Sequence, residues 1–122
     1  SILNDGQIEL IAECMNEVKM FNAPVTSDDL KAILSCKPKV IFRSNNNRYL
    51  AFLFSELSYR NLITPNWQSV IANHKLFLSK DKSRDKYLNQ GDLATATNYV
   101  KDIDHVKGYA IIDKYIKQLK KL

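Results

Sequence analysis

Residues 46–61 read NNRYLAFLFSELSYRN and contain the most continuously apolar stretch of the chain. If this segment is helical, its apolar side chains cover most of the circumference, which indicates a helix that is surrounded by protein. The asparagines that open it can cap the first turn. We therefore expect residues 46–61 to form the central helix of the core.

Amphipathic segments precede this helix. From Ile8 to Val18, apolar residues recur at steps of three and four while glutamates occupy other positions, which predicts a helix over about 5–21. Thr26 resembles an N-cap with an acidic first turn after it, which predicts a short helix over about 27–35. Both helices need an apolar surface to pack against.

Three more helices are expected after the central one, over about 65–78, 90–102 and 108–121. Thr64 can cap the first of them, with Pro65 at its first helical position. Residues 79–87 are polar and of mixed charge, which is typical of an exposed loop. The β-branched run at 40–42 and residues 84–88 are candidates for one small two-stranded element.

The fold class expected from these segments is all-α, with about six helices, one small two-stranded wing, and a helix-turn-helix or winged-helix-like core. We expect residues 1–39 to form an acidic leader of two helices packed on a basic body, residues 40–122, in one compact domain. The chain starts at Ser1 without an initiator methionine, which leaves open a longer parent protein.

Composition limits the function classes. No apolar run approaches the roughly 20 residues of a membrane span, and no signal-like segment opens the chain, so we expect a cytoplasmic protein without membrane partners. Cys14 and Cys36 are too few for a disulfide framework, and reduced, buried thiols are expected.

No motif in the chain is typical of an enzyme, a phosphate-binding loop or a metal site. His74 and His105 lack partners at a spacing that indicates a metal or a catalytic triad. A pair of Cys14 or Cys36 with His74 stays open, because nucleophile and base meet in space and not in sequence. We expect a protein that is not an enzyme and needs no cofactor.

Charge is unevenly distributed along the chain. Residues 1–36 hold two basic and six acidic residues, a net charge of −4, whereas residues 37–122 hold 16 basic and 7 acidic residues, a net charge of +9. Such a body favours an anionic partner, or a docking of the leader on the body. The candidate nucleic-acid-binding residues are Lys80, Lys82, Arg84, Lys86, Gln90, Asn98, Lys101, Lys114, Lys117, Lys120 and Lys121.

Two helix-break-helix units are candidates for a helix-turn-helix. In the first, the central helix leads to the Trp67 helix, with outward side chains at Gln68, Ser69, Asn73 and Lys75. In the second, the Trp67 helix leads to the helix at 90–102, with outward side chains at Gln90, Thr95, Asn98 and Lys101. Trp67 itself is expected to pack in the core, because aromatic residues at helical spacing are usually buried.

A resemblance to a known family rests on core and turn positions from Asn46 to Ile116. They are Leu50-Ala51-Phe52-Leu53-Phe54 with Leu57, Leu62-Ile63, Asn66-Trp67-Gln68, Phe77, Asp92-Leu93, Gly108-Tyr109, Ile112-Asp113 and Ile116. This stretch resembles the C-terminal domains of RteC-like proteins of Bacteroides-type mobile elements and related uncharacterised proteins. The resemblance implies a regulatory, winged-helix-like, DNA-binding domain linked to excision or transfer of a conjugative transposon.

Two functional hypotheses follow. The first is a non-enzymatic regulatory or DNA-binding domain of a mobile genetic element, with duplex DNA as its partner. The second is a helical protein-interaction module without nucleic-acid binding, in which the leader helix docks another protein or a second copy. They differ in one structural requirement, since DNA binding needs the lysines to converge with an outward helix on one face.

Overall fold

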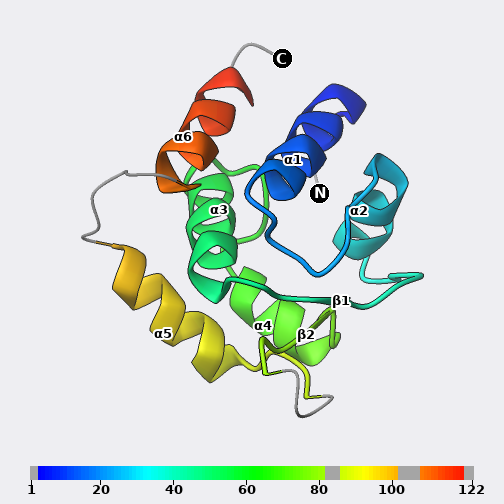
Figure 1. The fold of residues 1–122 in the computed structure, drawn as a ribbon, viewed down its shortest axis with the longest axis vertical. Helices are drawn as coiled ribbons and strands as arrows, with labels where there is room; N and C mark the ends of the chain where they lie inside the picture. Colours follow the sequence, from blue (N-terminus) through cyan, green and yellow to red (C-terminus); the bar gives the residue numbers. More distant parts are fainter. Residues whose placement is uncertain (1–2, 82–85, 102–107, 120–122) are drawn as a thin grey trace.

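Helix α3 (Asn47–Tyr59) lies at the centre of the fold, as its apolar circumference predicts (Figure 1). The computed structural model describes residues 3–81, 86–101 and 108–119. Around α3 stand α1 (Asp5–Glu17), α2 (Ser27–Leu34), α4 (Trp67–Asn73), α5 (Gln90–Val100) and α6 (Gly108–Leu119), with two short strands, β1 (Phe42–Arg43) and β2 (Phe77–Leu78). The fold is mainly helical with one small two-stranded sheet, which confirms the expected fold class.

The helix starts follow the capping chemistry of the sequence. Asn4, Thr26 and Asn89 each cap a helix in a reciprocal capping box with the residue three positions later, at α1, α2 and α5 respectively. Asn46 caps α3 by accepting the backbone N–H groups of Arg48 and Tyr49. Expected and observed starts therefore agree within a residue at these four helices.

Helices α1 to α4 each end earlier than the sequence predicts. All four end with the same backbone conformation. The residue after the C-cap has a left-handed backbone, at Lys19, Cys36, Asn61 and Lys75, with φ between 52° and 59°. In each case the next N–H bonds back to the carbonyl five residues earlier, which is a Schellman motif. The leader helix thus ends at Glu17 and not at residue 21, and the Trp67 helix ends at Asn73 and not at residue 78.

The sequence predicted only one of the two paired strands at about the right position. β1 pairs in parallel with β2, with Phe42 opposite Phe77 and Arg43 opposite Leu78. Residues 40–42 and 84–88 are therefore not the paired strands that we expected. Tyr87 forms only an isolated antiparallel bridge with Leu78, and part of 84–88 lies outside the described residues. Phe77 belongs to a strand and packs its ring on Phe21 at a centroid distance of 4.8 Å.

The connection before α4 also differs from expectation. Pro65 lies in a turn and not at the first helical position, and Asn66 precedes the helix without a side-chain cap. The Thr64 hydroxyl accepts the backbone N–H of Asn66 at 3.2 Å. Trp67 is buried and packs edge-on against Phe54 of α3 at a centroid distance of 5.6 Å, so its expected place in the core is confirmed.

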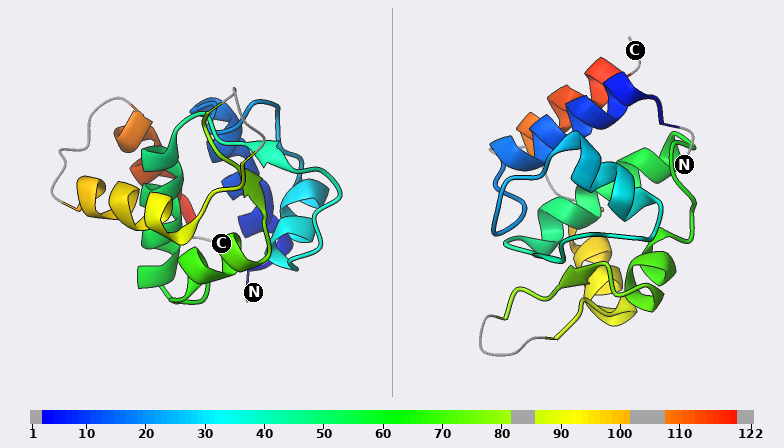
Figure 2. Two further views of the ribbon diagram at one scale, coloured as in Figure 1. Left: turned by 90° about the horizontal axis from the view of Figure 1, so that it is seen from below. Right: turned by 90° about the vertical axis from the view of Figure 1, so that its right-hand side faces the viewer.

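Helix α1 lies between α2 and α6 and contacts both (Figures 1 and 2). Its apolar residues, including Ile11 and Met15, belong to the same hydrophobic cluster as α3. The Tyr115 hydroxyl on α6 donates to the Glu17 carboxylate on α1 at 2.6 Å. The acidic leader is thus docked on the basic body through apolar packing, through the contact of Tyr115 with Glu17, and through hydrogen bonds that join Asn22 to Arg43 and the Asn45 side chain to the carbonyls of Lys19 and Phe21.

The start of α6 approaches α3 closely. A Cβ on Gly108 would come within 2.2 Å of the Tyr49 ring, and the Tyr49 ring is itself held edge-on by Tyr109 at a centroid distance of 5.0 Å. Only glycine fits this crossing without a shift of the ring. The position explains why a glycine opens the last helix.

Candidate nucleic-acid interface

Helix α5 presents an uncharged polar face to solvent. Leu93, Ala96 and Val100 bury one side of the helix against α3 and α4. Thr95 and Asn98 are exposed on the opposite side, and Gln90 is exposed in the first turn, beside α4. Asp92 is the only acidic residue of the helix, and its carboxylate is engaged in the capping box. An exposed helix face of amide and hydroxyl groups is suited to hydrogen bonding with base edges.

A short hairpin leads directly into α5. The backbone N–H of Ser79 donates to the Lys86 carbonyl at 2.6 Å, and that of Leu88 donates to the Phe77 carbonyl at 2.9 Å. These bonds place the exposed Lys80 and Lys86 on facing sides of the hairpin, just before the Asn89 cap of α5. Ser79 is buried, which differs from the exposed loop expected over 79–87.

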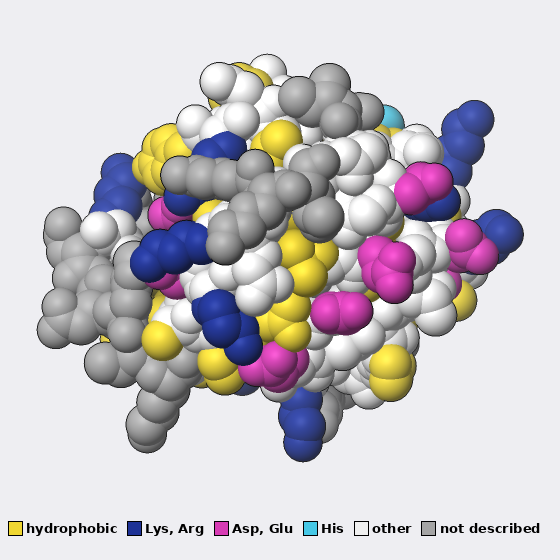
Figure 3. Space-filling model, turned by 90° about the horizontal axis from the view of Figure 1, so that it is seen from above, with side chains coloured by type: hydrophobic (Ala, Val, Ile, Leu, Met, Phe, Trp, Pro, Cys, Tyr) yellow, Lys and Arg dark blue, Asp and Glu magenta, His cyan; other side chains and the backbone are white. Residues whose placement is uncertain are grey.

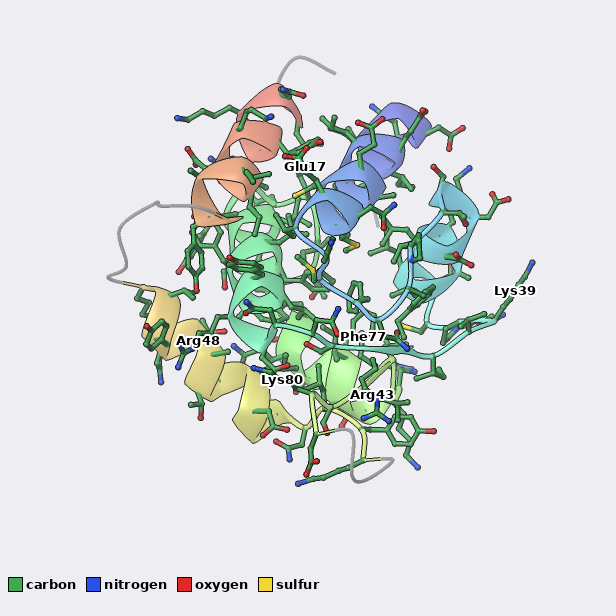
Figure 4. The ribbon with its side chains drawn as sticks, in the orientation of Figure 1. Glu17, Lys39, Arg43, Arg48, Phe77 and Lys80 are labelled. Atoms are coloured by element: carbon green, nitrogen blue, oxygen red, sulfur yellow. The ribbon has the colours of Figure 1, made fainter. Side chains whose placement is uncertain are left out.

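Arg43 of β1 fastens this hairpin to the body. Its Nη1 donates to the Ser79 carbonyl at 2.9 Å and to the Asp81 carbonyl at 2.8 Å. Figure 4 shows Arg43 and Lys80 at the same end of the molecule. Bonds from a guanidinium to two carbonyls fix the direction of the hairpin more firmly than a single bond would. No local pattern indicates this role of Arg43, because the role depends on the pairing of β1 with β2.

Arg48 is a second cation that the sequence reasoning missed. Its guanidinium carbon lies 3.5 Å from the centroid of the exposed Tyr99 ring, so Arg48 of α3 reaches over α5 (Figure 4). Stacking on an aromatic ring orients a guanidinium while leaving its edge free to donate hydrogen bonds. We call the exposed Gln90, Thr95 and Asn98, together with Arg48, Lys80, Lys86 and Lys101, the α5 surface.

The remaining described lysine candidates do not converge with this surface. Lys114 and Lys117 lie on α6, at the end of the molecule opposite the hairpin (Figures 1 and 2). Seen from above, this end of the molecule carries Asp and Glu side chains as well as Lys and Arg side chains (Figure 3). Lys117 pairs with Asp113 at 3.0 Å. Lys117 is therefore paired with an acidic side chain, and the described basic candidates divide into two groups.

Four of the candidate residues, Lys82, Arg84, Lys120 and Lys121, lie outside the described residues.

Of the two helix-break-helix units, only the second leaves its last helix open to solvent. Gln68 Nε2 donates to the Thr97 hydroxyl at 3.0 Å, and the Ser69 hydroxyl donates to Gln90 Oε1 at 3.3 Å. Gln68 and Ser69 are half-buried against α5 and do not face outward as expected. Asn73 and Lys75 are exposed. Helix α4 thus supports α5 and shows little of its own polar face.

The leader helix offers little apolar surface to a partner. Its apolar stripe, including Ile8, Ile11 and Met15, is buried by the chain's own core. A partner of α1 would therefore meet mainly its polar, acidic face. Docking of another molecule on the apolar stripe would first require α1 to leave the body.

Groups able to carry chemistry are few in the described part of the chain. Cys14 is fully buried, and this burial raises the pKa of its thiol to about 12, with the Glu17 carboxylate adding to the rise and Lys114 opposing it. A thiol with so high a pKa is a poor nucleophile. His74 is exposed at the end of α4, and His105 lies outside the described residues. Over residues 3–81, 86–101 and 108–119, no three His, Cys, Asp or Glu side chains are grouped to hold a metal ion.

None of the helices within the described ranges is both long and apolar enough to cross a membrane. Comparisons with models of known protein families, with curated proteins and with solved structures find no match for the chain.

Proposed function

We propose that the chain is a non-enzymatic regulatory domain that binds duplex DNA through the α5 surface. The observation that supports this best is the combination of an exposed, uncharged polar helix face with cations at both ends and along one side. Lys80 and Lys86 lie before the helix, Lys101 lies at its end, and Arg48 lies beside it. Phosphate contacts position a protein on DNA, and polar side chains on a helix read the base edges.

The dimensions of α5 agree with this role. Its 11 residues span roughly 16 Å at 1.5 Å per residue, and a helix fits the major groove, which is about 12 Å wide. Asn98 lies near the middle of the exposed arc of the helix, and Gln90 lies in its first turn. The Asn98 side chain can form paired hydrogen bonds with adenine, and Gln90, whose Oε1 accepts from the Ser69 hydroxyl, can donate through its amide N–H groups. In this arrangement the hairpin corresponds to the wing of a winged helix, and Lys80 and Lys86 contact the phosphate backbone of the DNA.

The biological setting belongs to the same proposal. The resemblance to RteC-like domains favours a transcription regulator of a mobile genetic element that acts in the cytoplasm. The geometry of the α5 surface supports nucleic-acid binding independently of that resemblance. The interaction module is the weaker candidate, because the apolar face of α1 is covered by the chain itself.

A nuclear magnetic resonance titration tests the location of the interface. On addition of a mixed-sequence duplex at low salt, we expect the side-chain amide signals of Gln90 and Asn98 and the backbone signals of Lys80 and Lys86 to shift most. Signals of α6, such as that of Lys117, should change little. Shifts concentrated on α6 and α1, with α5 unchanged, would contradict the proposal.

A further inference from the structure

An apolar pocket opens between α2 and α4, away from the α5 surface. It has a volume of about 120 Å³, and its floor is formed by the buried side chains of Ile33, Phe54 and Ile71. Trp67 lines one wall and makes an edge-on contact with Phe54. An engineered cavity of roughly 150 Å³ with an aliphatic and aromatic lining holds benzene in another protein. The volume therefore suits a single six-membered ring.

The mouth of the pocket carries two polar groups and no charge. Thr64 is exposed at the rim, and Cys36 is half-buried there. The Thr64 oxygen accepts a hydrogen bond from the Asn66 backbone, and its O–H group can donate to a second molecule. Since no charged side chain among the described residues lines the pocket, an ionic ligand would lose its hydration without compensation.

We propose that this pocket binds a small neutral molecule with one aromatic ring and a single hydroxyl or carbonyl oxygen near Thr64. Phe54 and Trp67 in the lining favour a ring over an aliphatic chain, because an edge-on or offset contact with these two side chains adds to the burial of apolar surface. The absence of charge from the lining excludes carboxylates and ammonium groups as the buried part. This binding does not depend on whether the chain binds DNA.

The test uses p-cresol, toluene and p-toluate as probes, which share a methylated ring and differ in their polar group. Binding is followed by the methyl signals of Thr64 and Val70 and by the indole N–H signal of Trp67, the only tryptophan of the chain. We expect saturable shifts with p-cresol and a dissociation constant of about 1 mM or tighter. Toluene should bind about three- to tenfold more weakly, because it lacks the hydrogen bond to Thr64. The p-toluate anion should bind more weakly than either.

Variants of the lining separate this pocket from general hydrophobic binding. Val70→Phe fills the pocket from α4 and should weaken p-cresol binding at least about tenfold. Val40→Phe adds the same volume at a side chain that is 52% exposed and lies outside the pocket. This variant should therefore bind p-cresol with the same affinity as the unmodified chain. Thr64→Val should reduce the affinity for p-cresol to that for toluene while leaving toluene binding unchanged.

Protection of Cys36 provides a readout that does not require any variant to fold. Cys14 is fully buried, so Cys36 is the thiol accessible to iodoacetamide. Saturating p-cresol should slow the alkylation of Cys36 severalfold, and p-toluate at the same concentration should not. The proposal is overturned if p-cresol gives no saturable shift, if Val70→Phe binds it unchanged, or if all three probes bind alike.

Discussion

Replacing Phe54 with alanine is expected to lower the free energy of unfolding by about 3–5 kcal/mol. Phe54 is buried and joins three elements, because its ring contacts Trp67 of α4 and Phe77 of β2 at centroid distances of 5.6 Å and 6.4 Å. The smaller side chain would lose this burial and leave a cavity between α3 and the strand. Leu53→Ala, at a side chain that is only 1% exposed, should cost about 2–5 kcal/mol for the same reason.

Tyr59 on the same helix provides the control, because its side chain is 71% exposed. Tyr59→Ala should change stability by no more than about 0.5 kcal/mol. Urea unfolding followed by circular dichroism measures all three variants. If Phe54→Ala and Leu53→Ala unfold at the same urea concentration as Tyr59→Ala, α3 is not the central helix of the core.

The second large effect concerns the cations of the α5 surface. Changing Lys80, Lys86 and Lys101 together to alanine should make duplex binding less dependent on salt, lowering the slope of log K against log salt by up to about 2.7. Each lysine that neutralises a phosphate releases counterions, at about 0.9 per contact. All three side chains are exposed, so stability should change by less than about 0.5 kcal/mol per substitution.

A control variant with the same loss of charge lies elsewhere on the molecule. Lys37, Lys114 and Lys117 are also exposed, and their replacement by alanine lowers the net charge equally. Fluorescence anisotropy with a labelled duplex at several salt concentrations compares the two triple variants. If both lower the slope by the same amount, binding depends on net charge and not on the α5 surface.

The existence of each helix could be predicted, because local pattern and capping residues act within a few positions of each other. Asn89 with Asp92 marks the start of α5, and the Thr26 capping box marks the start of α2. The ends were harder to predict. Lys19 and Lys75 adopt a left-handed backbone, which is usually found at glycine. The helices before these two lysines are therefore shorter than the sequence predicts.

The strand pairing could not be read from local pattern. Phe77 fits the apolar face of an extended Trp67 helix as well as it fits a strand. Its pairing with Phe42 joins residues that are 35 positions apart in the sequence, and a local pattern cannot indicate such a partner. The β-branched run predicted a strand at 40–42, close to the observed strand at 42–43. It did not indicate the strand with which this one pairs.

The α5 surface was predicted in part. The exposure of Gln90, Asn98 and Lys101 follows from the amphipathic pattern of α5, which buries Leu93 and Ala96. The stacking of Arg48 on Tyr99 was missed, because these residues belong to different helices. The separation of Lys114 from Lys80 was missed for the same reason. A high number of lysines in a stretch of sequence does not indicate which of them lie on the same face of the folded protein.

Duplex binding by the unmodified chain tests the central claim most directly. The measurement is the affinity for a mixed-sequence duplex from about 50 mM to 200 mM salt, at protein concentrations that extend above the non-specific range of roughly 10⁻⁶ to 10⁻⁴ M. With four cations on the α5 surface in contact with phosphates, the affinity should fall with a slope of about −3.6 in log K against log salt. No detectable binding at about 50 mM salt, or binding that does not change with salt, would contradict a DNA-binding domain.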